Sequence, residues 1–147
     1  MKFITSLLAG LLLASVCQAQ KAPLQEPDYN KPRQFLSLPL IVPVLMQQLD
    51  SMLTKPEGAS VSLQLKDLRL NGQVVSRSDG YDRDLQSVVI RMNPGGNIFA
   101  LSRRQLKEGA EWTGRIVSYQ YGDALELVQD GTGYRFEKRD LYDLLSK

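Results

Sequence analysis

The clearest regular pattern is the alternation of apolar and polar residues near the end of the chain. Alternation with a period of two, interrupted by turns that contain glycine and aspartate, is typical of antiparallel strands. The sequence predicts a three-stranded meander here, formed by Glu111–Tyr119, Ala124–Gln129 and Gly133–Glu137. The turns are expected at Tyr121-Gly122-Asp123 and at Asp130–Gly133.

A further hairpin is predicted earlier in the chain. Its apolar residues stand first on odd and then on even positions: Val61, Leu63, Leu65, Leu68 and Leu70. This change of phase predicts one extra residue near Lys66-Asp67, in a β-bulge or a corner of the strand. Asn71-Gly72 follows, and this dipeptide is the strongest short-range signal for a hairpin turn. We therefore expect a two-residue turn at Asn71-Gly72, with Leu68 opposite Val75.

Two more strands are predicted in the middle of the chain, at Gln86–Met92 and Asn97–Leu101. The second is apolar on both faces through Ile98 and Phe99, so we expect it to lie deep in the sheet. The basic segment Arg103–Glu108 is expected to be a connection with about one helical turn.

Two segments have the spacing of amphipathic helices. The first follows Pro43, which suits the first turn of a helix. Its apolar side chains fall on one face: Leu45, Met46, Leu49, Met52 and Leu53. We expect this helix to lie on the sheet; the alternative is a surface segment, Phe35–Leu53, that contacts a partner or a membrane. The second is Arg139–Leu145, with an expected buried stripe of Leu141, Leu144 and Leu145.

Together these elements predict a mainly β (α+β) fold. We expect a small antiparallel barrel or sandwich of about seven short strands, with one amphipathic helix before the sheet and a short C-terminal helix. A chain of 147 residues is long enough for one domain with a packed core. That core is expected to contain Ile98, Phe99, Trp112, Ile116, Leu127 and Phe136.

The chain is expected to have three parts. Residues 1–19 combine Lys2, an apolar run and small residues, which is typical of a secretory signal peptide. A retained anchor is the alternative, although the apolar run is short for a membrane span. Residues 20–34 are rich in proline and predict an extended leader, either a frayed terminus or an arm that docks on a partner. Residues 35–147 form the single β-rich globular domain.

The signal peptide predicts a periplasmic or secreted protein. Cys17 is the single cysteine, and it would anchor the protein only if it became lipidated. The bulky Val16 before it disfavours that modification. If Cys17 is removed with the signal peptide, the mature protein has no disulfide and depends on its packed core.

Composition and charge exclude several kinds of function. A net charge of +2 is too close to neutral to favour binding of nucleic acid. The chain has no histidine, so it has neither a histidine catalyst nor a histidine metal ligand. The expected mature chain also has no Ser-x-x-Lys, no Gly-x-Ser-x-Gly and no glycine-rich phosphate loop. We therefore expect no catalytic residues and no cofactor.

Carboxylates remain as candidates for chemistry. Asp79, Asp82 and Asp84 share one loop and offer oxygen ligands to Ca²⁺, but their spacing does not match an EF-hand and Arg83 competes for them. The alternative is a solvated turn. A glycosidase would need two carboxyl groups across a sugar-sized cleft, and no spacing in the chain supports such a pair.

Basic and aromatic residues form the best candidate binding site. These residues are Arg103, Arg104, Lys107, Arg115, Tyr119 and Tyr121. Arginine and aromatic side chains are enriched in protein interfaces. We therefore expect an exported, non-catalytic binding or adaptor module of the cell envelope, whose partner is another envelope or secreted protein. The alternatives are an inhibitor or ligand-binding barrel for a secreted enzyme, sugar or lipid, and a hydrolase that uses carboxylates alone.

Overall fold

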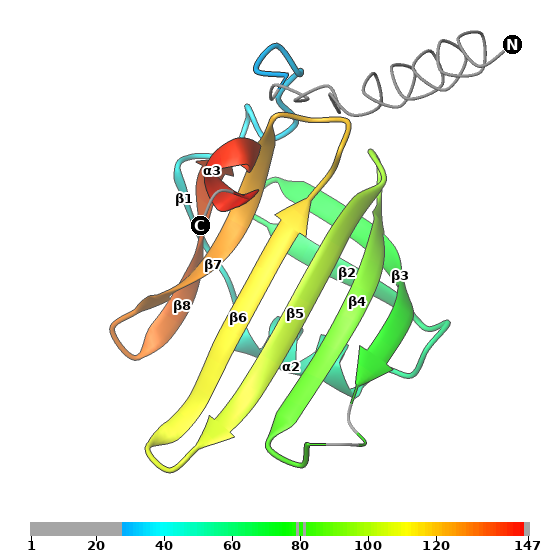
Figure 1. The fold of residues 1–147 in the computed structure, drawn as a ribbon, viewed down its shortest axis with the longest axis vertical. Coiled ribbons are helices and arrows are strands. Elements are labelled where there is room, and N and C mark those ends of the chain that lie inside the picture. The colour runs from blue at the N-terminus through cyan, green and yellow to red at the C-terminus, as the bar shows by residue number, and fades with distance from the viewer. Residues whose placement is uncertain (1–27, 79, 81, 146–147) are drawn as a thin grey trace, which may run out of the picture.

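The computed structural model describes residues 28–78, 80 and 82–145, and the strands in this part of the chain form one antiparallel sheet (Figure 1). The strands are β1 (Ile41–Pro43), β2 (Ser60–Leu65), β3 (Leu68–Ser78), β4 (Leu85–Asn93), β5 (Asn97–Leu106), β6 (Gly109–Val117), β7 (Asp123–Asp130) and β8 (Gly133–Asp140). Their order across the sheet is β1-β8-β7-β6-β5-β4-β3-β2. The predicted signal peptide and Cys17 lie outside the described residues.

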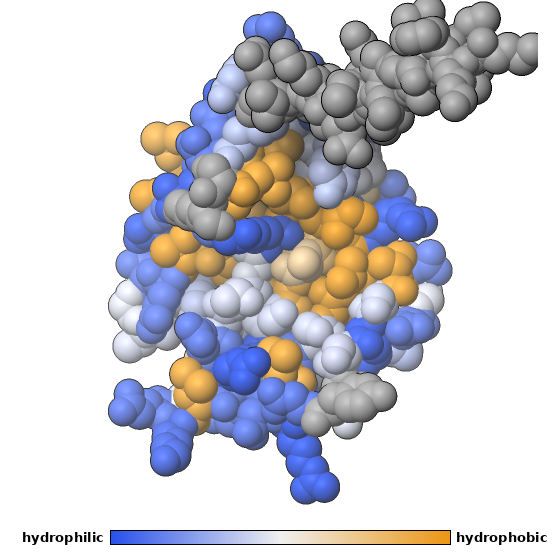
Figure 2. Space-filling view, in the orientation of Figure 1, coloured by the Kyte–Doolittle hydropathy of each residue, from blue (hydrophilic) through white to orange (hydrophobic). Residues whose placement is uncertain are grey.

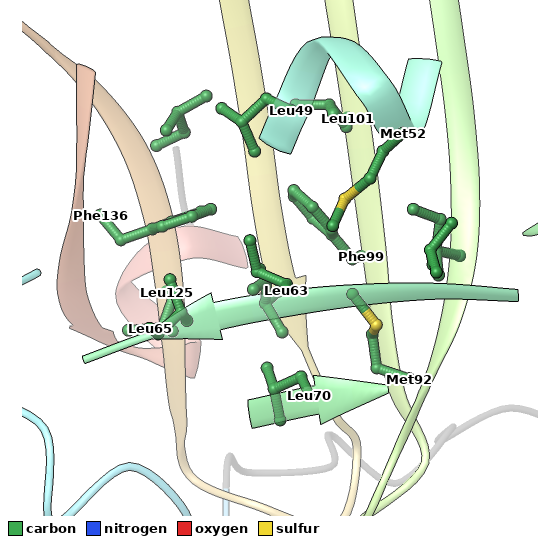
Figure 3. Close-up of a cluster of buried hydrophobic side chains, with 14 of the residues drawn as sticks. Leu49, Met52, Leu63, Leu65, Leu70, Met92, Phe99, Leu101, Leu125 and Phe136 are labelled. Atoms are coloured by element: carbon green, nitrogen blue, oxygen red, sulfur yellow. The ribbon is translucent and has the colours of Figure 1, made fainter. Parts of the chain in front are cut away.

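The sheet curls into an open half-barrel whose concave side holds the core (Figures 1 and 3). Helix α2 (Met46–Thr54) covers this side and contributes Leu49 and Met52 to the core. Phe99 of β5 and Phe136 of β8 are fully buried, and their rings meet edge to face with centroids 5.9 Å apart. The predicted mainly β fold is confirmed, with eight strands in the described chain rather than about seven.

The predicted core is confirmed except at one position. Phe99, Trp112, Ile116, Leu127 and Phe136 are all buried in the same cluster. Ile98 is only half-buried, and it lies on the outer face of β5. The expectation that this strand is deeply buried on both faces is therefore wrong, because the main core lies on the concave side and the small cluster beneath α3 on the outer face does not include Ile98.

The first hairpin turns at Lys66-Asp67 and not at the predicted Asn71-Gly72. Leu65 pairs with Leu68 across this turn, and Asn71-Gly72 lies inside β3. Lys66 adopts a φ of 53°. A two-residue turn moves the inward-facing leucines from odd-numbered positions before the turn to even-numbered positions after it. No bulge is therefore needed at Lys66-Asp67. Gly72 has a different purpose, since a Cβ at this position would lie 2.6 Å from the carbonyl oxygen of Arg91 on β4.

The helix predicted before the sheet begins later than expected, and a strand precedes it. Pro43 belongs to β1 rather than to a first helical turn, and α2 starts at Met46. Leu45 stays outside the helix and is 68% exposed. Proline lacks an N–H group, so it suits an edge strand such as β1.

Two other boundaries differ from the predictions. Strand β5 extends to Leu106 and pairs along its length with β6, so most of Arg103–Glu108 is strand rather than a helical connection. In this segment the hydrogen bonds between β5 and β6 outweigh the weak local preference for a helical turn. The C-terminal helix α3 (Leu141–Leu145) is confirmed with Leu141 and Leu144 buried, whereas Leu145 is 63% exposed.

The segment 28–40, which includes the described part of the predicted leader, is bonded to the sheet. The backbone N–H groups of Gln34 and Phe35 donate to the two carboxylate oxygens of Asp123, at 2.7 and 2.8 Å. Asp123 stands at the start of β7 and is 1% exposed. Phe35 is itself fully buried in the core, so this segment is a packed part of the domain.

Candidate functional site

The structure does not place the predicted binding residues on one surface. Arg103 points to the concave side, where it reaches α2, whereas Arg104 lies on the outer face because neighbouring residues of a strand alternate. Tyr119 and Tyr121 lie in the β6–β7 loop, at the end of β6 away from the β5–β6 turn that carries Lys107. The predicted patch is therefore divided between both faces and both ends of the sheet.

Arg103 holds α2 against the sheet. Its Nη1 donates to Asp50 Oδ1 of α2 at 2.7 Å, and its Nη2 donates to Gln86 Oε1 of β4 at 2.6 Å. Its guanidinium carbon lies 5.6 Å from the centre of the Trp112 ring, which is a cation–π distance. These contacts indicate that Arg103 stabilises the fold and is not free to bind a partner.

Arg104 and Arg115 lie on the outer face, and each has a carboxylate partner. Arg104 Nη1 is 3.4 Å from Asp82 Oδ2, and Arg115 Nη2 is 3.3 Å from Glu126 Oε1. Tyr119 is 81% exposed, so its ring is open to a partner. These three residues remain available on the surface, but far apart along the sheet.

The loop proposed for Ca²⁺ is only partly described. Asp79 lies outside the described residues. Asp82 pairs with Arg104, and its Oδ1 accepts a hydrogen bond from the backbone N–H of Asp84 at 3.0 Å, as in an Asx turn. Within the described part of the chain, no group of three or more acidic, cysteine or histidine side chains is placed to hold a metal ion.

The outer face of the sheet carries an apolar strip that the sequence pattern did not reveal. The register sets Val89 of β4 opposite Ala100 of β5, and Ile98 of β5 opposite Val117 of β6. Ala100 is exposed and the other three are half-buried. We call these four residues the outer strip. Figure 2 shows apolar side chains gathered in the middle of this face, with hydrophilic ones around them. Only the pairing of strands brings these residues together.

Charged residues border the outer strip. Arg91 lies opposite Ile98, and Arg115 lies opposite Ala100. From Arg115 a row of alternating charges continues across β7 and β8, with the nitrogen and oxygen atoms of each pair 2.6 to 3.3 Å apart. The row consists of Arg115, Glu126, Arg139, Glu137, Arg135 and Asp130.

The ion pairs shift the protonation equilibria of two groups in this row. The hydrogen bond from Arg135 lowers the pKa of Glu137 below its usual value, and the charge of Arg139 adds to that effect. Hydrogen bonds to Glu137 and Asp130 raise the pKa of Arg135. Both groups are therefore charged at neutral pH, and the row is a fixed array of alternating charges beside the outer strip.

Side chains fill the concave side of the half-barrel. Leu49 and Met52 of α2 point toward Phe99 and Leu63 of the sheet in Figure 3. These four side chains are each no more than 2% exposed. These four side chains therefore leave no room for a ligand in this part of the core.

No protein-family model, curated protein or solved structure matches this chain. None of the helices in the described residues is long and apolar enough to cross a membrane. The geometry and chemistry of the described surfaces are therefore the basis for assigning a function.

Proposed function

We propose that the protein is an exported, non-catalytic binding module of the cell envelope that acts through protein–protein contacts. The observation that carries this proposal is the outer strip, a set of neighbouring apolar residues on the outer face that meets the cluster of Ala124, Leu141 and Leu144 at Val117. Arg91 and Arg115 stand at its border. An apolar centre with arginine around it is the composition found in protein interfaces. The signal-peptide pattern of residues 1–19 supports export, so the partner is another envelope or secreted protein.

The alternative of a barrel that encloses a sugar or lipid has less support. Such a barrel needs an interior cavity. Here the side chains of α2 and of the segment around Phe35 occupy the concave side. An inhibitor of a secreted enzyme remains compatible with the outer strip, because it would also bind a protein.

A hydrolase that uses carboxylates alone also has less support. Glu126 and Glu137 are directly opposite each other on β7 and β8. Both are bonded to Arg139, and the pKa of Glu137 is lowered by the hydrogen bond from Arg135 and by the charge of Arg139. An acid–base pair needs one carboxyl group whose pKa is raised, and the surroundings of Glu137 act in the opposite direction.

Affinity capture from an envelope extract tests the proposal. Ala100→Glu places a carboxylate in the middle of the outer strip at an exposed position, so the fold is retained. The matched control is the same change at Ala110, an exposed residue near the far end of β6. We expect the wild type and Ala110→Glu to retain one stoichiometric protein and Ala100→Glu to lose it. Equal retention by all three, or no stoichiometric partner, would contradict the proposal.

A further inference from the structure

Among the described residues 28–78, 80 and 82–145, strand β2 ends the sheet and one of its edges is unpaired. The backbone N–H of Val74 donates to the carbonyl oxygen of Ala59, which fixes the alternation of bonded pairs along β2 and β3. It follows that Ser60, Ser62 and Gln64 direct their backbone N–H and C=O groups away from β3. Within the described chain these groups have no backbone partner. They form a row of donors and acceptors at the spacing that a further strand requires.

The two edges of the sheet differ in how they are protected. Strand β1 is three residues long and contains Pro43, and both features discourage pairing with another chain. Strand β2 has six residues, Ser60–Leu65, and contains neither proline nor a charged residue. The edge of β2 therefore lacks the usual devices that prevent strand addition.

A groove lies between the first half of β2 and helix α2. Ser60, Val61 and Ser62 line one side of it, and Gln47, Gln48, Ser51 and Met52 line the other. Val61 and Met52 are buried, so the floor of the groove is apolar.

One end of the groove is closed and carries a positive charge. The chain turns from α2 into β2 through residues 55–59, so a strand bound in the groove has to end or bend there. Lys55 stands at this end and is the charged residue that lines the groove. A chain that runs antiparallel to β2 would approach Lys55 with its C-terminus, and a terminal carboxylate complements the ammonium group.

We propose that this groove binds the extended C-terminal segment of another protein as an added strand antiparallel to β2, with the terminal carboxylate beside Lys55. Backbone bonds to Ser60, Ser62 and Gln64 provide the affinity, as in other cases of strand addition. Alternate side chains of the segment lie over Val61 and Met52. This inference rests on the proposed binding function, but it uses a surface that shares no residue with the outer strip.

The probe is a displayed library of random octapeptides with free C-termini, followed by synthetic peptides of the enriched sequences. Ser62→Pro removes the N–H that faces the groove and leaves the bonds between β2 and β3 intact, and Ser62→Ala is its control. Lys55→Met removes the charge without touching the edge. We expect peptide binding to be lost in Ser62→Pro and unchanged in Ser62→Ala. We expect the affinity of Lys55→Met to be about tenfold weaker, because a hydrogen bond to a charged group is worth about 1.5 kcal/mol or more. Amidation of the peptide should weaken binding to the wild type equally.

Several results would overturn the inference. Enrichment of the same peptides by Ser62→Pro, with circular dichroism showing a native sheet, would exclude the edge of β2. Equal affinity for amidated peptides would exclude the carboxylate. Self-association that Ser62→Pro abolishes, seen by sedimentation velocity, would assign the edge to a second copy instead. Because Ala100→Glu and Ser62→Pro alter separate surfaces, failure of the capture experiment and failure of the peptide experiment are distinguishable.

Discussion

Asp123 shows how one buried carboxylate orders a distant part of the chain. It is 1% exposed, and both of its oxygens accept backbone N–H groups from Gln34 and Phe35. A carboxylate has two acceptor oxygens and no hydrogen-bond donor. It can therefore accept both backbone N–H groups without burying an N–H or O–H group that lacks an acceptor. The start of β7 thereby fixes the segment that carries Phe35 into the core.

Replacement of Asp123 by asparagine tests this role. Asparagine presents one oxygen and one NH₂ group, so one of the two backbone N–H groups would face a donor. We expect Asp123→Asn to lower the free energy of unfolding by about 1–3 kcal/mol, measured by urea denaturation. Asp140→Asn is the control, because its ion pair with Arg33 is half-exposed and should be worth less than about 1 kcal/mol. Equal losses in the two variants would contradict the assignment.

At the scale of elements, the sequence predicted those strands whose alternation and turns agree. The meander of β6, β7 and β8 is confirmed near its predicted positions, because the turns between those strands contain Gly122 and Gly131. The first hairpin was misplaced, because Asn71-Gly72 has the chemistry of a turn while the packing of leucines favours Lys66-Asp67. Local preference was overruled by cross-strand pairing, which a single sequence does not display.

Gly72 supplies a test of that explanation. We infer that glycine is present at this position because β4 lies too close for a side chain. An added Cβ would lie 2.6 Å from the Arg91 carbonyl oxygen and 2.7 Å from the Met92 sulfur, so these atoms would have to move. We expect Gly72→Ala to destabilise the protein by about 1–3 kcal/mol in thermal or urea denaturation. Gly80→Ala is the matched control, since its Cβ would meet nothing within 4 Å. A neutral Gly72→Ala would indicate that the contact with β4 relaxes easily.

The candidate site was harder to predict than the strands for a related reason. Arg103 and Arg104 are neighbours in sequence, and their density suggested one patch, but a strand sends them to opposite faces. Conversely, Val89 and Val117 belong to separate strands, and only the register places both in the outer strip. A surface built from several strands depends on which residues pair across neighbouring strands. The pattern of apolar and polar residues did not predict that register.

At the scale of the whole molecule, the row of charges across β6, β7 and β8 links stability to pH. The pKa of Glu137 is lowered in the folded protein, chiefly by the hydrogen bond from Arg135. A lowered pKa means that the stabilisation is fully present above the ordinary value of 4.5 and is lost as the pH falls through the folded-state value. Unfolding is therefore expected to become easier in acid partly because Glu137 takes up a proton.

The contribution of Glu137 is measurable as a difference between two pH profiles. We expect the free energy of unfolding of Glu137→Gln to be lower than that of the wild type at pH 7, and the gap to narrow as the pH falls below about 4.5. Glu108→Gln, a change to an exposed carboxylate in the β5–β6 turn, is the control. A gap that is constant from pH 7 to pH 3 would show that Glu137 contributes through packing rather than through its charge.

The pairing of β1 with β8 has a consequence for how the protein is made. Val42 lies opposite Phe136, so nearly the whole domain separates two strands that are neighbours in the sheet. A ribosome delivers β1 first and β8 last. Until β7 and β8 have been synthesised, Phe35 lacks its bond to Asp123 and Val42 lacks its strand partner Phe136. Contacts between such distant parts of a chain form slowly. Native assembly is therefore expected only after β8 has been synthesised, which leaves the growing chain unfolded until then and in need of protection from aggregation.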